Sequence, residues 1–169
     1  MPIRGTFLLP STVTKTLVCI DTVESAEFGG RFYNQYLPDC IEFGGAYDFV
    51  NKMEDIFDRF RFPHAFFQSR AFRASHIMCQ QDAIADKLIC YQDETIFTQQ
   101  KGCKVTILLQ VLTRQHATWQ GMALWVEENC SVRFQSVQEL LGMIVDTLSK
   151  PSGGIQLANW EKRVEERQG

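Results

Sequence analysis

Apolar positions in the second half of the chain change from strand-like to helix-like spacing near residue 136. Runs rich in aliphatic, β-branched and aromatic residues come first, and polar connections separate them. Ser136 and Glu139 then form a capping box ahead of apolar residues at helical spacing, and Pro151 ends that pattern. The pattern predicts three strands and a helix, at residues 105–114, 119–127, 131–134 and 137–148.

The first half of the chain has the same order of elements. Strands are predicted at residues 12–23, 28–36 and 40–43, and Asp48 stands near the start of a helix, where the helix dipole favours a negative charge. One face of this helix carries only apolar side chains, at Ala46, Phe49, Val50, Met53, Phe57 and Phe60.

The two halves align at a constant offset of 91, residues 18–58 on residues 109–149, without a gap. Five positions are identical, which is little better than chance: Thr22/Thr113, Ala26/Ala117, Gly30/Gly121, Phe43/Phe134 and Asp55/Asp146. The shared order of strands, turns and helix faces favours a duplication. The alternative is two unrelated stretches with ordinary amphipathic patterns.

The predicted fold class is α+β, with two ββ(β)α units related by a pseudo-two-fold axis and a helix over each antiparallel sheet. The expected divisions are a first unit (1–60), a connector (61–102), a second unit (103–150) and a charged C-terminal tail (151–169). Within the connector, residues 82–91 fit either a helix or a strand. Residues 156–169 are expected to form a short charged helix.

Composition places this chain among globular proteins. It has 169 residues, 45% of them apolar, and a formal net charge of −3, which argues against wholesale electrostatic binding to nucleic acid or an anionic membrane. The opening residues lack the apolar core of a signal peptide, so we expect a cytoplasmic protein without membrane contact. The six cysteines are scattered, and free thiols are expected.

No catalytic or metal-binding pattern is found in the sequence. His76 and Cys79 have a workable metal spacing, but zinc sites usually need a second close pair, which is missing. There is no Gly-x-Ser-x-Gly motif, no Walker pattern and no Rossmann spacing. Acidic pairs such as Glu54-Asp55 lie where solvated acids are common. The chain is therefore expected to be no enzyme and to need no cofactor or metal.

Residues 59–76 combine arginines with phenylalanines and contain no acidic residue. Arginine and aromatic side chains are typical both of protein–protein hot spots and of single-stranded nucleic-acid sites. A third interpretation places the phenylalanines in the core and the arginines in solvent. With the two strand tryptophans, the candidate partner-binding residues are Arg59, Arg61, Phe66, Phe67, Arg70, Phe72, Arg73, Trp119 and Trp125.

Trp119 and Trp125 lie six residues apart on one predicted strand. Alternation puts both on one face and Met122 and Leu124 on the other. We expect a helix to cover the face opposite the tryptophans, which leaves the tryptophans at the boundary between the units or on an open patch.

The second unit resembles small uncharacterised proteins of Firmicutes, often carried on mobile elements. The likeness rests on Trp119-Gln120-Gly121, then Trp125, then Phe134-x-Ser136-x-x-Glu139-Leu140-Leu141, and covers about 45 residues. It brings no known activity. A mobile-element setting implies small non-catalytic inhibitors of host machinery, anti-CRISPR proteins among them.

These observations predict a non-enzymatic protein-binding module, an inhibitor or accessory factor that acts by protein–protein contact. The expected partner is a protein, with a nucleic-acid enzyme as one candidate. The alternative is a module that binds RNA or single-stranded DNA through residues 59–76.

Overall fold

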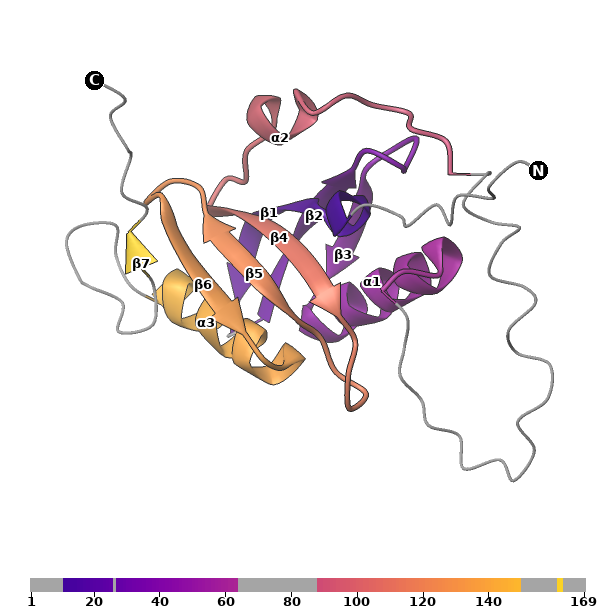
Figure 1. Ribbon diagram of the computed structural model, residues 1–169. Coiled ribbons are helices and arrows are strands. Elements are labelled where there is room, and N and C mark those ends of the chain that lie inside the picture. The colour runs from indigo at the N-terminus through magenta and orange to yellow at the C-terminus, as the bar shows by residue number, and fades with distance from the viewer. Residues whose placement is uncertain (1–10, 26, 64–87, 150–160, 163–169) are drawn as a thin grey trace, which may run out of the picture.

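An antiparallel sheet runs through the whole fold and carries helices on one face. The computed structural model describes residues 11–25, 27–63, 88–149 and 161–162 (Figure 1). The strand order is β3-β2-β1-β4-β5-β6-β7. The strands are β1 (Thr16–Glu24), β2 (Glu27–Asn34), β3 (Ile41–Gly44), β4 (Val105–Thr113), β5 (Gln120–Trp125), β6 (Cys130–Phe134) and β7 (Glu161–Lys162). The predicted α+β class and antiparallel pairing are confirmed.

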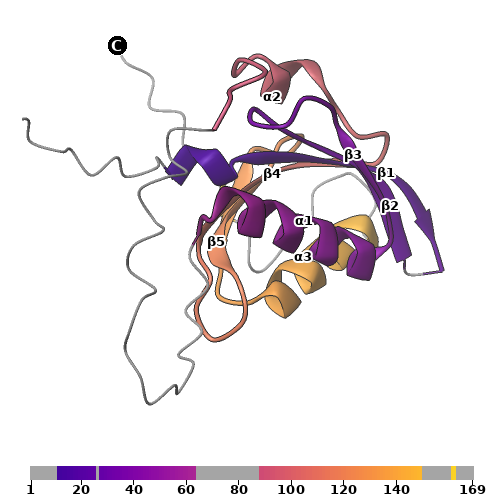
Figure 2. The ribbon, with the colours of Figure 1, turned by 90° about the vertical axis from the view of Figure 1, so that its right-hand side faces the viewer.

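Two long helices cover one face of the sheet and a short one lies on the other (Figure 2). The long helices are α1 (Ala46–Phe60), which follows β3, and α3 (Val137–Ser149), which follows β6. The short elements are a 3-10 turn, η1 (Ser11–Thr14), and α2 (Ile96–Gln99). We call the face under α1 and α3 the inner face and the opposite one the outer face.

Two glycines let neighbouring strands approach closely. A Cβ atom on Gly30 would lie 1.9 Å from the Cys19 carbonyl oxygen, and one on Gly121 would lie 2.1 Å from the Gln110 carbonyl oxygen. Any side chain at these positions would therefore clash with the backbone of the paired strand. Glycine is therefore required at positions 30 and 121 for these strands to pair.

Both long helices have a carboxylate in the first turn, as the sequence predicts, and each carboxylate accepts a backbone N–H that precedes the helix. The Glu139 N–H donates to Ser136 Oγ at 3.0 Å, and the Glu139 carboxylate accepts the Gln135 N–H at 2.7 Å. At α1, the Asp48 carboxylate accepts the Gly44 N–H at 2.9 Å. Carboxylates of the chain itself therefore satisfy backbone donors at both helix starts.

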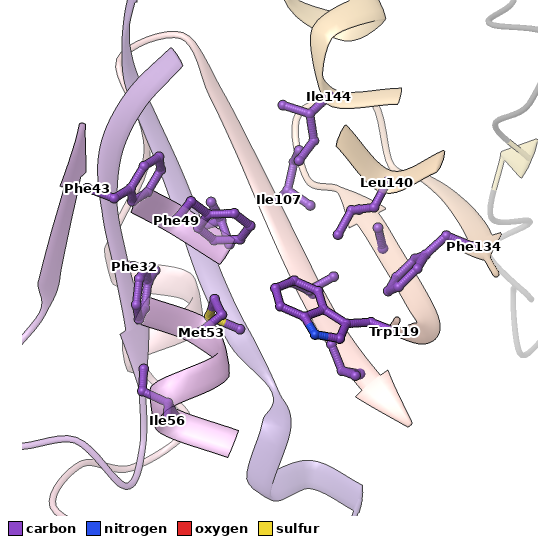
Figure 3. Close-up of a cluster of buried hydrophobic side chains, with 14 of the residues drawn as sticks. Phe32, Phe43, Phe49, Met53, Ile56, Ile107, Trp119, Phe134, Leu140 and Ile144 are labelled. Atoms are coloured by element: carbon purple, nitrogen blue, oxygen red, sulfur yellow. The ribbon is translucent and has the colours of Figure 1, made fainter. Parts of the chain in front are cut away.

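Trp119 is at the centre of the inner core and is fully buried. Its ring meets Phe57 and Phe49 of α1 edge to face, with centroids 5.3 and 6.3 Å apart. Figure 3 shows Trp119 between the α1 side chains and Leu140 of α3. Because Trp119 belongs to the second half of the chain and α1 to the first, this contact joins the two halves.

A second, smaller core lies on the outer face. Leu17 and Cys19 of β1 are fully buried there beneath Ile96 and Phe97 of α2. Leu108 of β4 packs against the edge of this group. Residues on both faces of β1 are therefore buried, which explains why the strand is apolar without alternation.

The β3 edge of the sheet is blocked by side chains of α1. Lys52 Nζ donates to the Glu42 carbonyl oxygen at 2.8 Å and to Asp48 at 2.8 Å, and Asp48 holds the Gly44 N–H. Unpaired edge groups otherwise invite another strand to pair with them. The Asp48–Lys52 pair thus occupies positions that an added strand would need.

The predicted helix over residues 156–169 is wrong at the residues that are described there. Glu161 and Lys162 form β7 and pair with Ser131 and Cys130 of β6. A neighbouring strand edge offers backbone partners that a short charged helix with few apolar residues cannot match. Most of residues 82–91, where the sequence left helix and strand open, lies outside the described residues.

The central position of Trp119 yields a stability prediction. Trp119→Ala should lower the free energy of unfolding by about 3–5 kcal/mol, because it removes a buried ring and its contacts with α1. Urea denaturation followed by circular dichroism measures this loss. Tyr47→Ala, at a side chain 81% exposed, is the control and should change stability by less than about 0.5 kcal/mol. Equal effects of the two changes would contradict the assignment of Trp119 to the core.

Candidate interaction surface

Two of the predicted partner-binding arginines lie at the end of α1. Arg59 is exposed in its last turn, and Arg61 is exposed in a left-handed conformation (φ 51°) that ends the helix. Phe60 between them is buried and packs edge to face on Tyr36 at 6.1 Å. At the start of residues 59–76, the phenylalanine therefore lies in the core and the two arginines lie at the surface. The other candidates lie outside the described residues: Phe66, Phe67, Arg70, Phe72 and Arg73.

The tryptophans require a partial correction: the helices cover the face that carries them, although Trp119 does lie at the boundary between the two halves, as expected. Trp119 is fully buried, and Trp125 is partly buried and packs against the same core. Indole rings offer the largest apolar area, so burying them under α1 and α3 is the more stabilising arrangement. Trp119 therefore belongs to the core and not to a partner-binding surface, and Met122 and Leu124 occupy the outer face.

A buried arginine that the sequence analysis missed joins α1 to the end of β4. Arg114 donates through Nε to the Pro63 carbonyl oxygen at 2.7 Å, and through Nη1 to Glu54 at 2.7 Å and Asp58 at 2.9 Å. Only 6% of its side chain is exposed. Glu54 also accepts the indole N–H of Trp119. The network positions the chain where residues 61–63 leave α1.

Removing the Arg114 charge should cost stability. Arg114→Met keeps the length of the side chain but leaves the Pro63 carbonyl and two carboxylates without their donor. We expect a loss of about 2–4 kcal/mol, since hydrogen bonds to charged groups are strong and the carboxylates keep some solvent. Thermal and urea unfolding measure it. Arg59→Met, at an exposed site on α1, is the control; a similar loss in both variants would refute a special role for Arg114.

The outer face divides into a covered part and an open part. Over β1 and β2, residues 100–103 are held by polar side chains: Arg31 Nη2 donates to the Lys101 carbonyl at 3.1 Å, and Asp21 accepts the Cys103 N–H at 2.9 Å. Arg31 also pairs with Asp21. Burial alone would raise the pKa of Asp21, but these hydrogen bonds outweigh it and lower the pKa below its ordinary value.

Over β4 and β5 the outer face carries apolar side chains that remain accessible. Leu108 stands directly opposite Leu124, and Gln110 opposite Met122. Leu112 follows at the bulge of β4 and is 38% exposed. Figure 1 looks onto these strands, and no other part of the described chain lies over them. We call Leu108, Gln110, Leu112, Met122 and Leu124 the open patch.

The sequence contained a signal for the open patch that period-two alternation conceals. Six of the nine residues of β4 are apolar, and two of them, Leu108 and Leu112, lie on the outer face. The inner face of β4 is covered, whereas Leu112 on this strand is exposed and Leu108 and Gln110 are only partly buried. β4 therefore carries apolar side chains on its outer face that the described part of the chain covers only in part.

Groups that could carry covalent or metal chemistry are dispersed. Cys40, Cys90 and Cys103 are exposed, whereas Cys19 and Cys130 are buried. Among the described residues, no three His, Cys, Asp or Glu side chains gather as a metal site. His116 is exposed in the β4–β5 connection, and His64, His76 and Cys79 lie outside the described part of the chain. No helix in that part is long and apolar enough to cross a membrane.

Burial determines which thiols can react. It raises the pKa of Cys19 to about 11, and the nearby Arg31 charge only partly opposes this effect. At pH 7.5 only on the order of one Cys19 thiol in a few thousand is therefore the reactive thiolate. Alkylation by iodoacetamide, mapped by mass spectrometry, should modify Cys40, Cys90 and Cys103 in the folded protein and Cys19 only in urea. Rapid native labelling of Cys19 would contradict its placement under α2.

Comparisons with models of known protein families, with curated proteins and with solved structures found no match to this chain.

Proposed function

We propose that this chain is a non-enzymatic protein-binding module in which a duplicated ββ(β)α unit presents the open patch to a protein partner. The observation that carries the proposal is the open patch itself. On two adjacent strands Leu112 is exposed and Leu108, Met122 and Leu124 are only partly buried, whereas the inner face of the sheet carries the main core. Contiguous exposed apolar surface is a common mark of protein-interaction sites.

The duplication is supported by irregularities that recur at the offset of 91. The register of β1 with β2 shifts between Ile20 and Thr22, and that of β4 with β5 between Val111 and Thr113. The close approaches at Gly30 and Gly121 recur at the same spacing. Bulges are local features of individual strands, so two unrelated hairpins have no reason to share their position.

The pairing between the two units also supports a pseudo-two-fold axis. Leu17 and Leu108 are equivalent at the offset of 91, and they stand opposite each other where β1 pairs with β4. In a two-fold arrangement a residue stands opposite its own equivalent only at the axis, so the proposed axis would pass between these leucines. The caps of Asp48 on Gly44 and of Glu139 on Gln135 are equivalent too.

Equivalent positions on the outer face differ between the units in a way that favours binding at the second. Asp21 and Arg31 of the first unit correspond to Leu112 and Met122 of the second. The polar pair lies under the chain's own residues 100–103, whereas the apolar pair lies in the open patch. Exposing apolar surface to water costs more free energy than exposing polar surface. Covering the outer face by a partner would therefore stabilise the second unit more than the first.

Within this class we favour an inhibitor or accessory factor encoded on a mobile element. The likeness to Firmicutes mobile-element proteins supports that setting, and an inhibitor of the anti-CRISPR kind would need only a surface and no catalytic group. A nucleic-acid enzyme is one candidate partner.

A pull-down from bacterial lysate tests the proposal. The wild-type bait should retain a protein after nuclease treatment, and Leu112→Lys should lose it, because a charge within an apolar contact is desolvated without a partner. Val23→Lys, at a strand residue 39% exposed, is the matched control and should retain the protein. Equal recovery with Leu112→Lys and wild type would contradict binding through the open patch.

The nucleic-acid alternative gives a different result in the same experiment. Capture would then disappear with nuclease or with increasing salt, and it would depend on Arg59 and Arg61 instead of Leu112.

A further inference from the structure

The row of side chains that α2 covers continues into the open patch. Along this row Tyr33 stands opposite Leu17, Leu17 opposite Leu108, and Leu108 opposite Leu124. Ile96 and Phe97 of α2 bury Leu17 and pack against Tyr33 and Leu108, whereas Leu124 lies beyond them. The α2 interface and the open patch are therefore one continuous surface, and Leu108 belongs to both.

The way α2 binds indicates what kind of segment fits the rest of this surface. It is a single helical turn whose two adjacent apolar residues, one aliphatic and one aromatic, face the sheet. Under the proposed duplication, Leu17 and Tyr33 correspond to Leu108 and Leu124, so the open patch offers a similar pair of strand positions.

The charge of the outer face adds a second requirement. Arg133 of β6 is exposed and stands opposite Met122 at the border of the open patch. The five residues of the open patch itself are uncharged. A partner segment with a carboxylate beside Arg133 would therefore gain an ion pair there.

We propose that the open patch binds a short helical segment of a partner protein that carries adjacent aliphatic and aromatic side chains preceded by an acidic residue. This inference rests on the proposed protein-binding function and specifies the partner's chemistry. The apolar pair packs on Leu108, Leu112, Met122 and Leu124, and the acidic residue pairs with Arg133. Recognition is thus of the helix-on-surface type and needs no added strand, which agrees with the blocked β3 edge.

The chain itself supplies a probe of this chemistry. A synthetic peptide of residues 91–102 contains Asp93 and Glu94 followed by Ile96 and Phe97. Methyl NMR spectra of the full-length protein should show saturable shifts of Leu108, Leu112, Met122 and Leu124 as this peptide is added. A peptide with Ile96 and Phe97 replaced by Ser should leave these methyl signals unchanged.

Variants of the protein locate the contact. Leu124→Lys should weaken peptide binding by about tenfold or more, and Arg133→Glu should weaken it by a smaller factor that shrinks as salt is raised. Val23→Lys should bind like the wild type. Circular dichroism of each variant confirms that it is folded before titration.

The remaining outcomes separate this inference from the proposed function. No methyl shift with the peptide, while Leu112→Lys still abolishes the pull-down, would overturn the partner class and leave the binding surface standing. Shifts at the open patch that depend on protein concentration without peptide would show a second copy covering it and would overturn the proposal. Methyl shifts confined to Leu17 and Ile96 would show the peptide displacing α2, which also overturns it.

Discussion

The packing of Trp119 against α1 is the contact on which the arrangement of the two halves depends. α1 follows the first three strands, yet its Phe49 and Phe57 meet a ring from the second half of the chain. The indole N–H also binds Glu54, which in turn accepts from Arg114. Because apolar packing and a buried polar network meet at one residue, neither half can move relative to the other without exposing both.

This constraint determines which surfaces remain available for recognition. The inner face is filled by α1, α3 and the tryptophans, and α1 side chains also occupy backbone groups of the β3 edge. On the outer face, α2 covers β1 and β2 but leaves β4 and β5 accessible. In the described part of the chain, the outer face of the second half is therefore left with accessible apolar side chains on β4 and β5.

Sequence periodicity predicted the elements but not the faces they bury. The strand and helix positions followed from runs and spacing, and the caps at Asp48 and Glu139 followed from residue type. Alternation placed Trp119 and Trp125 together but could not say which face the helices cover, because a period of two is the same for both faces. The buried role of Arg114 could not be predicted for another reason. Its partners on α1 lie 56 and 60 residues away in the sequence, and only the fold brings them together.

The residues on which the proposed likeness to mobile-element proteins rests have structural roles in this chain. Trp119 and Phe134 fill the core, Gly121 permits close strand pairing, and Ser136 with Glu139 caps α3. Residues of this kind specify a fold and carry little information about a partner. Specificity must then come from positions that folding does not dictate. Leu112 and Met122 are such positions, since under the proposed duplication they align with Asp21 and Arg31 of the first half.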